Sequence, residues 1–304
     1  MKGKILITDS LFIFPEHEKL LRDAGYEIER LDKPEATEEE LVEHIPGKVG
    51  YILGGIEKVT DKVIDSADSL KAIVFTGSDA LSFIPAYDKA AKRGISIATT
   101  PGANSYAVAE YTVALMLAMT RNLFELGRTG EKKFETTRSL NELTVGIVGM
   151  GHIGIRVARM LSGLGVKKLL YTNRTRKKEV EEKMGLEFVT LDELLSESDI
   201  VSLHVSKTVG DGFIGKEQLA KMKNGALLVN CGFMGGVDRK ALLPELAAGR
   251  LRAAEDGPAD PVFSNLPLSV WYCSNAHTAY NTVEANKTAS DMAVQKLLSI
   301  FDRA

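Results

Sequence analysis

An apolar, β-branched run passes through a glycine-rich turn directly into a helical pattern at residues 144–154, which read TVGIVGMGHIG. The run predicts a buried strand, and the glycines predict a tight turn at its carboxyl end. Gly149 permits the sharp turn, Gly151 lets another group approach the backbone, and Gly154 lets the helix pack on its strand. A second strand-like run follows at 168–172. Strand, turn, helix and strand therefore occur in the order that a dinucleotide-binding unit requires.

The turn also predicts how such a ligand is held. The first N–H groups of the helix have no partner inside it, and the helix dipole adds a partial positive charge at the same end. An ordinary glycine-rich connection is the alternative interpretation. The complete context favours a pyrophosphate at the turn, and we expect a nicotinamide-type cofactor held by Gly149, Gly151, His152, Ile153 and Gly154.

The composition excludes several classes of protein. The chain has 304 residues, 44% of them hydrophobic and 26% charged, with a formal net charge of −3. This length allows two domains, and the charge gives no reason to expect nucleic acid or a membrane as a partner. Cys231 and Cys273 are too few for a disulfide framework, and the histidines show no metal-ligand spacing. We expect a cytoplasmic protein that begins with a strand at 4–8 rather than a signal peptide.

Strand-like and helical patterns alternate along the chain, which predicts an α/β fold with parallel sheets. The first third contains expected strands at 4–8, 27–30, 51–54, 72–76 and 96–99 and helices near 16–24, 38–45, 60–67 and 85–92. Pro101 and Gly102 then interrupt the pattern, and one long apolar helix is predicted at 105–126. Such a helix packs either in a core or in an interface between subunits.

A second alternation begins at residue 143. It contains expected strands at 143–148, 168–172, 188–189, 200–205, 226–230, 252–255 and 270–274, and a closing helix at 283–303. We therefore predict a Rossmann-type, doubly wound parallel sheet at 101–283 and a second, smaller flavodoxin-like α/β domain formed by 1–100 and 284–304. The first would bind the cofactor, and the discontinuous domain would bind substrate across a cleft between the two.

The end of the second strand distinguishes NAD from NADP. An acidic residue there binds the ribose hydroxyls and repels a 2′-phosphate, whereas a neutral residue followed by a cation accepts the phosphate. Here Asn173 fills the acidic position, and Arg174 and Thr175 follow it. A solvated basic turn is the alternative interpretation. The residues favour NADP, with NAD as the second choice.

Three further segments carry a resemblance to a known family. Residues 100–112 read TPGANSYAVAEYT, residues 228–238 read LVNCGFMGGVD, and residues 275–282 read NAHTAYNT. They resemble, in that order, the hinge helix, the strand with the catalytic arginine and the segment with the catalytic histidine of the D-isomer-specific 2-hydroxyacid dehydrogenases. The resemblance covers most of the chain and is strongest at 101–282.

The resemblance implies transfer of a hydride between a nicotinamide and C2 of a 2-hydroxy or 2-oxo acid. It makes His277 the proton donor, at a position just past a strand where such sheets place ligands. It makes Asp260 the carboxylate that orients this imidazole, although glutamate is usual there, and it matches Asp256 to a contact with the nicotinamide carboxamide. A structural histidine is the alternative for His277. Further cofactor contacts are expected from the ends of two other strands, at His204, Val205, Ser206, Cys231 and Gly232.

Phe233 is the largest departure from the family pattern. It stands where the resemblance calls for the substrate-binding arginine, and it has neither charge nor donor. Arg239 lies too far along the chain to replace that arginine and is expected to begin a helix. Backbone N–H groups in turns of the first domain can bind an anion instead, and we expect substrate contacts at Gly54, Gly77, Ser78 and Phe233.

Phe233 leaves three interpretations open. The protein reduces a 2-oxo acid slowly with His277 and the turns alone, or it takes a substrate with an apolar side, or it has lost catalysis. We expect an NADP-preferring oxidoreductase of a small 2-oxo or 2-hydroxy acid, and by resemblance a homodimer. The alternative is a catalytically silent NAD(P)-binding regulatory protein with the same fold.

Overall fold

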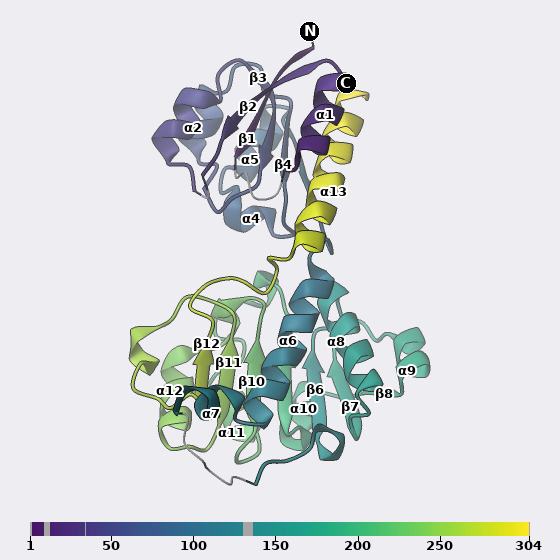
Figure 1. Ribbon diagram of the computed structural model, residues 1–304, viewed down its shortest axis with the longest axis vertical. Helices are drawn as coiled ribbons and strands as arrows, with labels where there is room; N and C mark the ends of the chain where they lie inside the picture. The colour runs from purple at the N-terminus through teal and green to yellow at the C-terminus, as the bar shows by residue number, and fades with distance from the viewer. Residues whose placement is uncertain (1, 9–12, 34, 130–135, 304) are drawn as a thin grey trace. The chain divides into compact units, whose positions relative to one another are not determined.

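The computed structural model of the chain describes residues 2–8, 13–33, 35–129 and 136–303. The chain divides into two compact units, one of Met1–Asn104 and Thr282–Ala304 and the other of Ser105–Asn281. Each unit is built on its own parallel β-sheet with helices on both faces (Figure 1). The predicted fold class, α/β with two parallel sheets, is confirmed.

The first unit has five parallel strands in the order β2-β1-β3-β4-β5, which is the order of a flavodoxin-like sheet. The strands are β1 (Gly3–Thr8), β2 (Tyr26–Leu31), β3 (Lys48–Leu53), β4 (Ala72–Phe75) and β5 (Ser96–Thr99). Helices α1 (Pro15–Asp23) and α13 (Val283–Phe301) cover one face of this sheet. The helices on the other face are α2 (Glu38–His44), α3 (Asp61–Ser66), α5 (Tyr87–Lys92) and the single-turn α4 (Ala80–Phe83).

The last helix of the chain, α13, completes the core of the first unit. Its buried face includes Ala293, Val294 and Leu297, and it packs against β4, β5 and α1. The small side chain of Ala293 lets the helix lie close to the sheet. His17 of α1 is buried, and its Nε2 lies 2.8 Å from the Asp291 carboxylate of α13. A polar contact therefore joins the first and last helices of this unit.

The second unit has seven parallel strands in the order β12-β11-β10-β9-β6-β7-β8. Counted from β6, this is the strand order of a doubly wound dinucleotide-binding sheet, extended by one strand. The strands are β6 (Thr144–Val148), β7 (Lys168–Thr172), β8 (Leu186–Phe188), β9 (Ile200–Leu203), β10 (Leu227–Asn230), β11 (Arg252–Glu255) and β12 (Trp271–Cys273).

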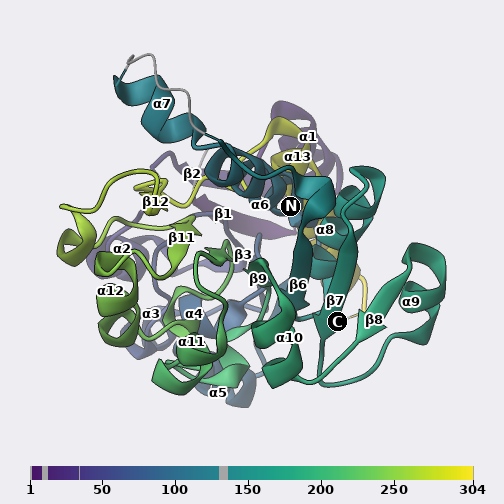
Figure 2. The ribbon, with the colours of Figure 1, turned by 90° about the horizontal axis from the view of Figure 1, so that it is seen from below.

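Helices cover both faces of this sheet (Figure 2). On one face lie α6 (Ser105–Thr120), α8 (His152–Gly163) and the adjoining α9 (Lys178–Met184), and on the other lie α10 (Leu191–Glu197), α11 (Lys216–Lys221) and α12 (Arg239–Ala247). The described residues of this unit also contain four short 3-10 turns: Leu140–Glu142, Lys207–Val209, Met234–Gly236 and Pro261–Phe263. The central strands β6, β9 and β10 are almost fully buried between these helix layers, which explains why they read as largely hydrophobic runs.

The prediction of one long helix at 105–126 is wrong, because α6 ends at Thr120 and a separate helix, α7 (Leu123–Thr129), follows it. Asn122 has a φ of 52°, in the left-handed region, which ends the first helix. The guanidinium of Arg252 donates to the Met119 carbonyl and to the Asn122 side chain, so a distant strand fixes the break. Helix α4 was not predicted, since four residues carry too little periodicity to detect.

No helix of residues 2–8, 13–33, 35–129 or 136–303 combines the length and hydropathy needed to cross a bilayer. Within the same residues, no three His, Cys, Asp or Glu side chains gather as a set of metal ligands. Cys231 and Cys273 are free thiols, the first buried and the second partly exposed.

The packing of α13 gives a stability prediction. Leu297→Ala removes a side chain that is 0% exposed, and we expect it to lower the free energy of unfolding by about 2–5 kcal/mol. Urea unfolding followed by circular dichroism measures the change. Leu20→Ala on α1 is the control, because Leu20 is 51% exposed and should lose less than about 0.5 kcal/mol. Equal losses in the two variants would contradict this account of the core.

Candidate functional site

The glycine turn between β6 and α8 has no room for a side chain at two of its three glycines. Gly149 has a φ of +98°, and a Cβ there would lie 2.4 Å from the carbonyl oxygen of His204. A Cβ on Gly154 would lie 2.1 Å from the Gly149 carbonyl oxygen. Around Gly151, by contrast, nothing lies within 4 Å of the same position. The turn is closed where it packs on the sheet and open where a ligand would approach.

A nicotinamide dinucleotide fits this turn. Helix α8 has 12 residues, and the N–H groups of His152, Ile153 and Gly154 in its first turn have no acceptor inside the helix. Gly151 leaves free space beside them, which is what a pyrophosphate needs to reach the backbone. The five residues predicted to hold the pyrophosphate therefore lie together in one turn.

Asn173 connects the glycine turn to the end of β7. Its Oδ1 accepts from the Met150 N–H at 3.0 Å, and its Nδ2 donates to the Thr175 carbonyl at 2.8 Å. Asn173 is thus engaged in holding the turn and carries no negative charge. Arg174 beside it is exposed and makes no hydrogen bond or ion pair with the described residues.

Arg176, the other guanidinium of this segment, has a partner. It forms two short hydrogen bonds to the Glu181 carboxylate, at 2.9 and 2.8 Å. Hydrogen bonds from Arg176 and from the Tyr171 hydroxyl lower the pKa of Glu181 to about 2. Of the two guanidinium groups in this segment, Arg174 is therefore the one that is not held by a carboxylate among the described residues.

His204 is a backbone neighbour of the glycine turn. Its N–H donates to the Val148 carbonyl at 2.7 Å, which extends the pairing of β9 with β6. Its Nε2 lies 2.8 Å from the Ser202 hydroxyl, and burial lowers the pKa of the imidazole to about 4, so the ring is neutral at pH 7. Val205 and Ser206 follow it at the same edge of the sheet.

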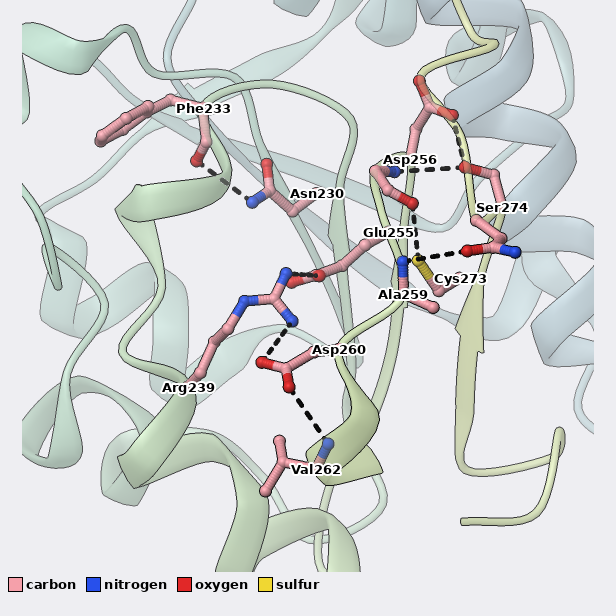
Figure 3. A network of polar contacts seen from close by, with 12 residues as sticks. Asn230, Phe233, Arg239, Glu255, Asp256, Ala259, Asp260, Val262, Cys273 and Ser274 are labelled. Atoms are coloured by element: carbon pink, nitrogen blue, oxygen red, sulfur yellow. Dashed lines mark hydrogen bonds and ion pairs between the residues drawn. The ribbon is translucent and has the colours of Figure 1, made fainter. Parts of the chain in front are cut away.

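The turn after β10 carries Cys231, Gly232 and Phe233. Asn230 holds it, because its Oδ1 accepts from the Gly232 N–H at 3.1 Å and its Nδ2 donates to the Phe233 carbonyl at 3.2 Å. Burial raises the pKa of the Cys231 thiol to about 12, which leaves it protonated. The Phe233 ring is partly exposed and points away from the polar network beside it (Figure 3).

That network is centred on Arg239. This residue begins α12, as we expected from the sequence. Its Nη2 lies 2.7 Å from Glu255 at the end of β11, and its Nη1 lies 3.6 Å from Asp260 (Figure 3). Glu255 is 2% exposed, and this burial raises its pKa to about 7 in spite of the guanidinium. The rings of Phe263 and Trp271 lie within 6 Å of the same cation, at 5.6 and 5.9 Å.

This network gives Asp260 a different partner from the one expected. The sequence analysis paired Asp260 with His277, but Asp260 lies against Arg239 and accepts from the Val262 N–H at 3.1 Å. It is one methylene shorter than glutamate, and its own short turn at Pro261–Phe263 holds it. The only hydrogen bond of His277 to the described part of the chain joins its Nδ1 to the Asp256 carbonyl, at 3.1 Å.

Asp256 instead anchors the segment that carries His277. Its carboxylate accepts from the Ser274 hydroxyl at 2.8 Å, from the Thr278 N–H at 3.0 Å and from the Ala279 N–H at 2.9 Å. The side chain is 4% exposed, so these contacts are internal. A carbonyl can only accept, so it places the proton of a neutral His277 on Nδ1 and leaves Nε2 as the exposed basic nitrogen.

The sites predicted in the first unit follow β3 and β4, which are neighbours in its sheet. Gly54 is buried, and its N–H lies 3.4 Å from the Thr8 hydroxyl. The Gly77 carbonyl accepts from the Thr100 N–H at 2.8 Å, and Ser78 is exposed. Lys58, a nearby cation, donates to the Ser82 carbonyl at 2.6 Å.

Sequence reasoning missed two buried polar clusters. One is the Arg239 network, which Glu255 at the end of β11 signals, because a buried carboxylate needs a partner. The other lies in the first unit, where the buried hydroxyls of Thr8 and Tyr51 contact Glu57, itself 1% exposed. No pattern in the sequence connects these three residues.

Comparisons with known proteins agree with this geometry. Residues 113–268 match the family described as D-isomer specific 2-hydroxyacid dehydrogenase, NAD binding domain. The chain is 36% identical to a glyoxylate reductase of Thermofilum pendens, over 87% of this chain and 82% of that protein. It is 33% identical to a D-3-phosphoglycerate dehydrogenase of Methanocaldococcus jannaschii, over 98% of this chain but only 57% of that longer protein.

Solved structures give the same result. The crystal structure of the TT0316 protein from Thermus thermophilus has a TM-score of 0.83 and 30% sequence identity, and the match covers 98% of this chain and 97% of that one. The chain therefore belongs to the D-isomer specific 2-hydroxyacid dehydrogenase family.

Proposed function

We propose that the chain is a nicotinamide-dependent oxidoreductase that interconverts a small 2-hydroxy acid and the corresponding 2-oxo acid. The observation that carries the proposal is that the glycine turn and the His277 segment follow strands of one parallel sheet, β6 and β12. The carboxyl ends of such strands share an edge, which is where these sheets bind ligands. Relatives named glyoxylate reductase and hydroxypyruvate reductase support this class of substrate.

In this proposal the residues of the second unit, residues 105–281, divide the work. The glycine turn binds the pyrophosphate, and Asn173, Arg174 and Thr175 surround the adenosine ribose. The bound nicotinamide supplies the hydride chemistry. His277 exchanges a proton with the substrate oxygen through Nε2, while its Nδ1–H stays on the Asp256 carbonyl. Asp256 acts as a positioning residue, and a direct contact of its carboxylate with the carboxamide stays a prediction.

The substrate contacts expected at Gly54, Gly77 and Ser78 of the first unit stay predictions from the sequence. Phe233 offers the substrate an apolar surface in place of a guanidinium, and Arg239 is already engaged by Glu255 and Asp260. Loss of one charge-assisted donor typically lowers the rate by a factor of about 10²–10³. We therefore infer a slow enzyme on the simplest 2-oxo acids, with a substrate that has an apolar group as the better one. The homodimer stays a prediction from the resemblance.

A silent cofactor-binding protein is the second candidate function. It is favoured by one observation, that neither Phe233 nor Asp260 is available for the role its position implies. Tight binding of NADPH without turnover of any 2-oxo acid would favour it over the enzyme.

The first functional prediction concerns His277. We expect His277→Ala to lower kcat by about 10²–10⁴-fold, because the proton donor is lost. Oxidation of NADPH and NADH is measured with glyoxylate, hydroxypyruvate and longer 2-oxo acids. His44→Ala in α2 is the matched control, since that imidazole contacts Glu29 on the first unit's sheet. Undiminished turnover in His277→Ala would rule out the acid/base role.

A second prediction separates the observed partner of Asp260 from the expected one. Asp260→Asn should change kcat by no more than about fivefold and leave the pH profile in place, because the lost interaction is the contact with Arg239. The pH dependence of kcat is the measurement. A hundredfold loss, or a displaced pH profile, would show that Asp260 orients His277 during turnover.

The third prediction concerns the choice of cofactor. Arg174→Ala should raise the KM for NADPH by about tenfold or more, with the KM for NADH nearly unchanged, because only NADPH carries a 2′-phosphate for the guanidinium. Lys178→Ala on α9 removes an equal charge outside the turn and serves as the control. Equal losses for the two cofactors in Arg174→Ala would exclude a phosphate contact.

A further inference from the structure

The second unit contains a cavity of about 200 Å³ at the opposite edge of its sheet from the glycine turn. Ile200, Leu227 and Arg252 are first residues of β9, β10 and β11, and all three line it. The remaining wall comes from the end of α6 and from two loops: Thr120, Asn122, Thr136, Thr137, Arg138, Leu143, Asp199, Asn224, Gly225 and Ala226. The proposed reaction uses none of these residues.

Arg252 brings a positive charge to this cavity that no carboxylate neutralises. Its Nε donates to the Ser269 carbonyl at 2.8 Å, and its Nη2 donates to the Met119 carbonyl and to the Asn122 side chain. All three acceptors are uncharged, and among the described residues Nη1 makes no hydrogen bond. Burial lowers the pKa of this guanidinium, which is the signature of a charge without a compensating anion.

The one acid of the cavity wall, Asp199, is already neutralised. Its carboxylate accepts from the Thr144 N–H at 2.9 Å and from Arg138 at 2.9 Å, and Lys223 lies 3.5 Å away. The cavity wall therefore combines two cations, Arg138 and Arg252, with the single carboxylate of Asp199. Two further cations, Lys223 and Arg121, contact lining residues. The balance of charge favours an anion.

The rest of the wall suits a small oxyanion with an organic part. The Thr137 hydroxyl oxygen accepts a hydrogen bond from Arg121 at 2.9 Å, so the hydroxyl proton of Thr137 is free to point toward another acceptor. Thr120 and Thr136 add two more hydroxyls to the cavity wall. Leu143, Ile200 and Leu227 form an apolar floor. Carboxylates and phosphates bind guanidinium groups through charge-assisted hydrogen bonds.

We propose that this cavity is a second ligand site, separate from the dinucleotide turn, that binds a small carboxylate or phosphate anion through Arg252 and Arg138. The site does not depend on the proposed reaction. The same charge arrangement would be present if the protein were catalytically silent.

The test is an NMR titration of the full chain with sodium acetate and, separately, with inorganic phosphate. We expect saturable shifts of the Gly225 and Thr137 amide signals with at least one anion, and the anion that saturates identifies the headgroup. Signals of Gly151 and Gly154 report binding at the glycine turn independently. Arg252→Gln should weaken binding at the cavity by roughly tenfold or more.

Two further variants keep the test decisive. Arg138→Gln leaves the tether between Arg252 and α6 intact and should weaken binding severalfold, so it remains informative if Arg252→Gln fails to fold. Arg22→Gln in α1, which removes an exposed guanidinium paired with Glu18, should change nothing. Absence of saturable shifts with both anions, or equal affinities in Arg138→Gln and Arg22→Gln, would overturn the proposal.

Discussion

The contact between Gly149 and the backbone of His204 is the constraint on which the second unit depends. The N–H of His204 donates to Val148, so the ends of β6 and β9 are held side by side. The carbonyl of His204 then occupies the space where a side chain of residue 149 would stand. Any Cβ there would separate the strands and displace the start of α8, which in turn rests on Gly149 through Gly154. The shape of the glycine turn, where we propose that the pyrophosphate binds, thus follows from a backbone contact rather than from a binding side chain.

Two buried ionisable groups at this edge act on stability in opposite directions. Burial raises the pKa of Glu255 from 4.5 to about 7, so between these values the folded chain keeps a proton that the unfolded chain loses, and stability falls as pH rises. Burial lowers the pKa of His204 from 6.5 to about 4, so over that range the unfolded chain binds a proton that the folded chain does not, and stability rises with pH. Because the windows overlap, each group offsets the other through the mildly acidic range.

The sequence was sufficient for the sheets and insufficient for the polar contacts, for a physical reason. Strands that are buried on both faces consist mostly of apolar residues, so β6 and β9 could be located from the sequence. The predicted strands were one or two residues longer than the observed ones. The glycine turn could be assigned because the need for its glycines arises from contacts of the local backbone, which the spacing of the glycines reveals. The break at Asn122 could not, since it depends on Arg252, which is 130 residues away. The contact of Asp260 with Arg239 could not be predicted for the same reason, because Arg239 reaches it only through the fold.

Asp260 contacts Arg239 rather than His277, and this affects how well His277 could act as an acid or base. A carboxylate partner would both orient an imidazole and stabilise the positive charge it gains on protonation. The Asp256 carbonyl orients the ring equally well, but it carries no net charge. Arg239, meanwhile, faces two carboxylates and has little attraction left for a third. Under the proposed function, His277 is oriented without a charged partner and position 233 supplies no guanidinium, and for these two reasons we propose a weak enzyme with an apolar substrate preference rather than a fast one.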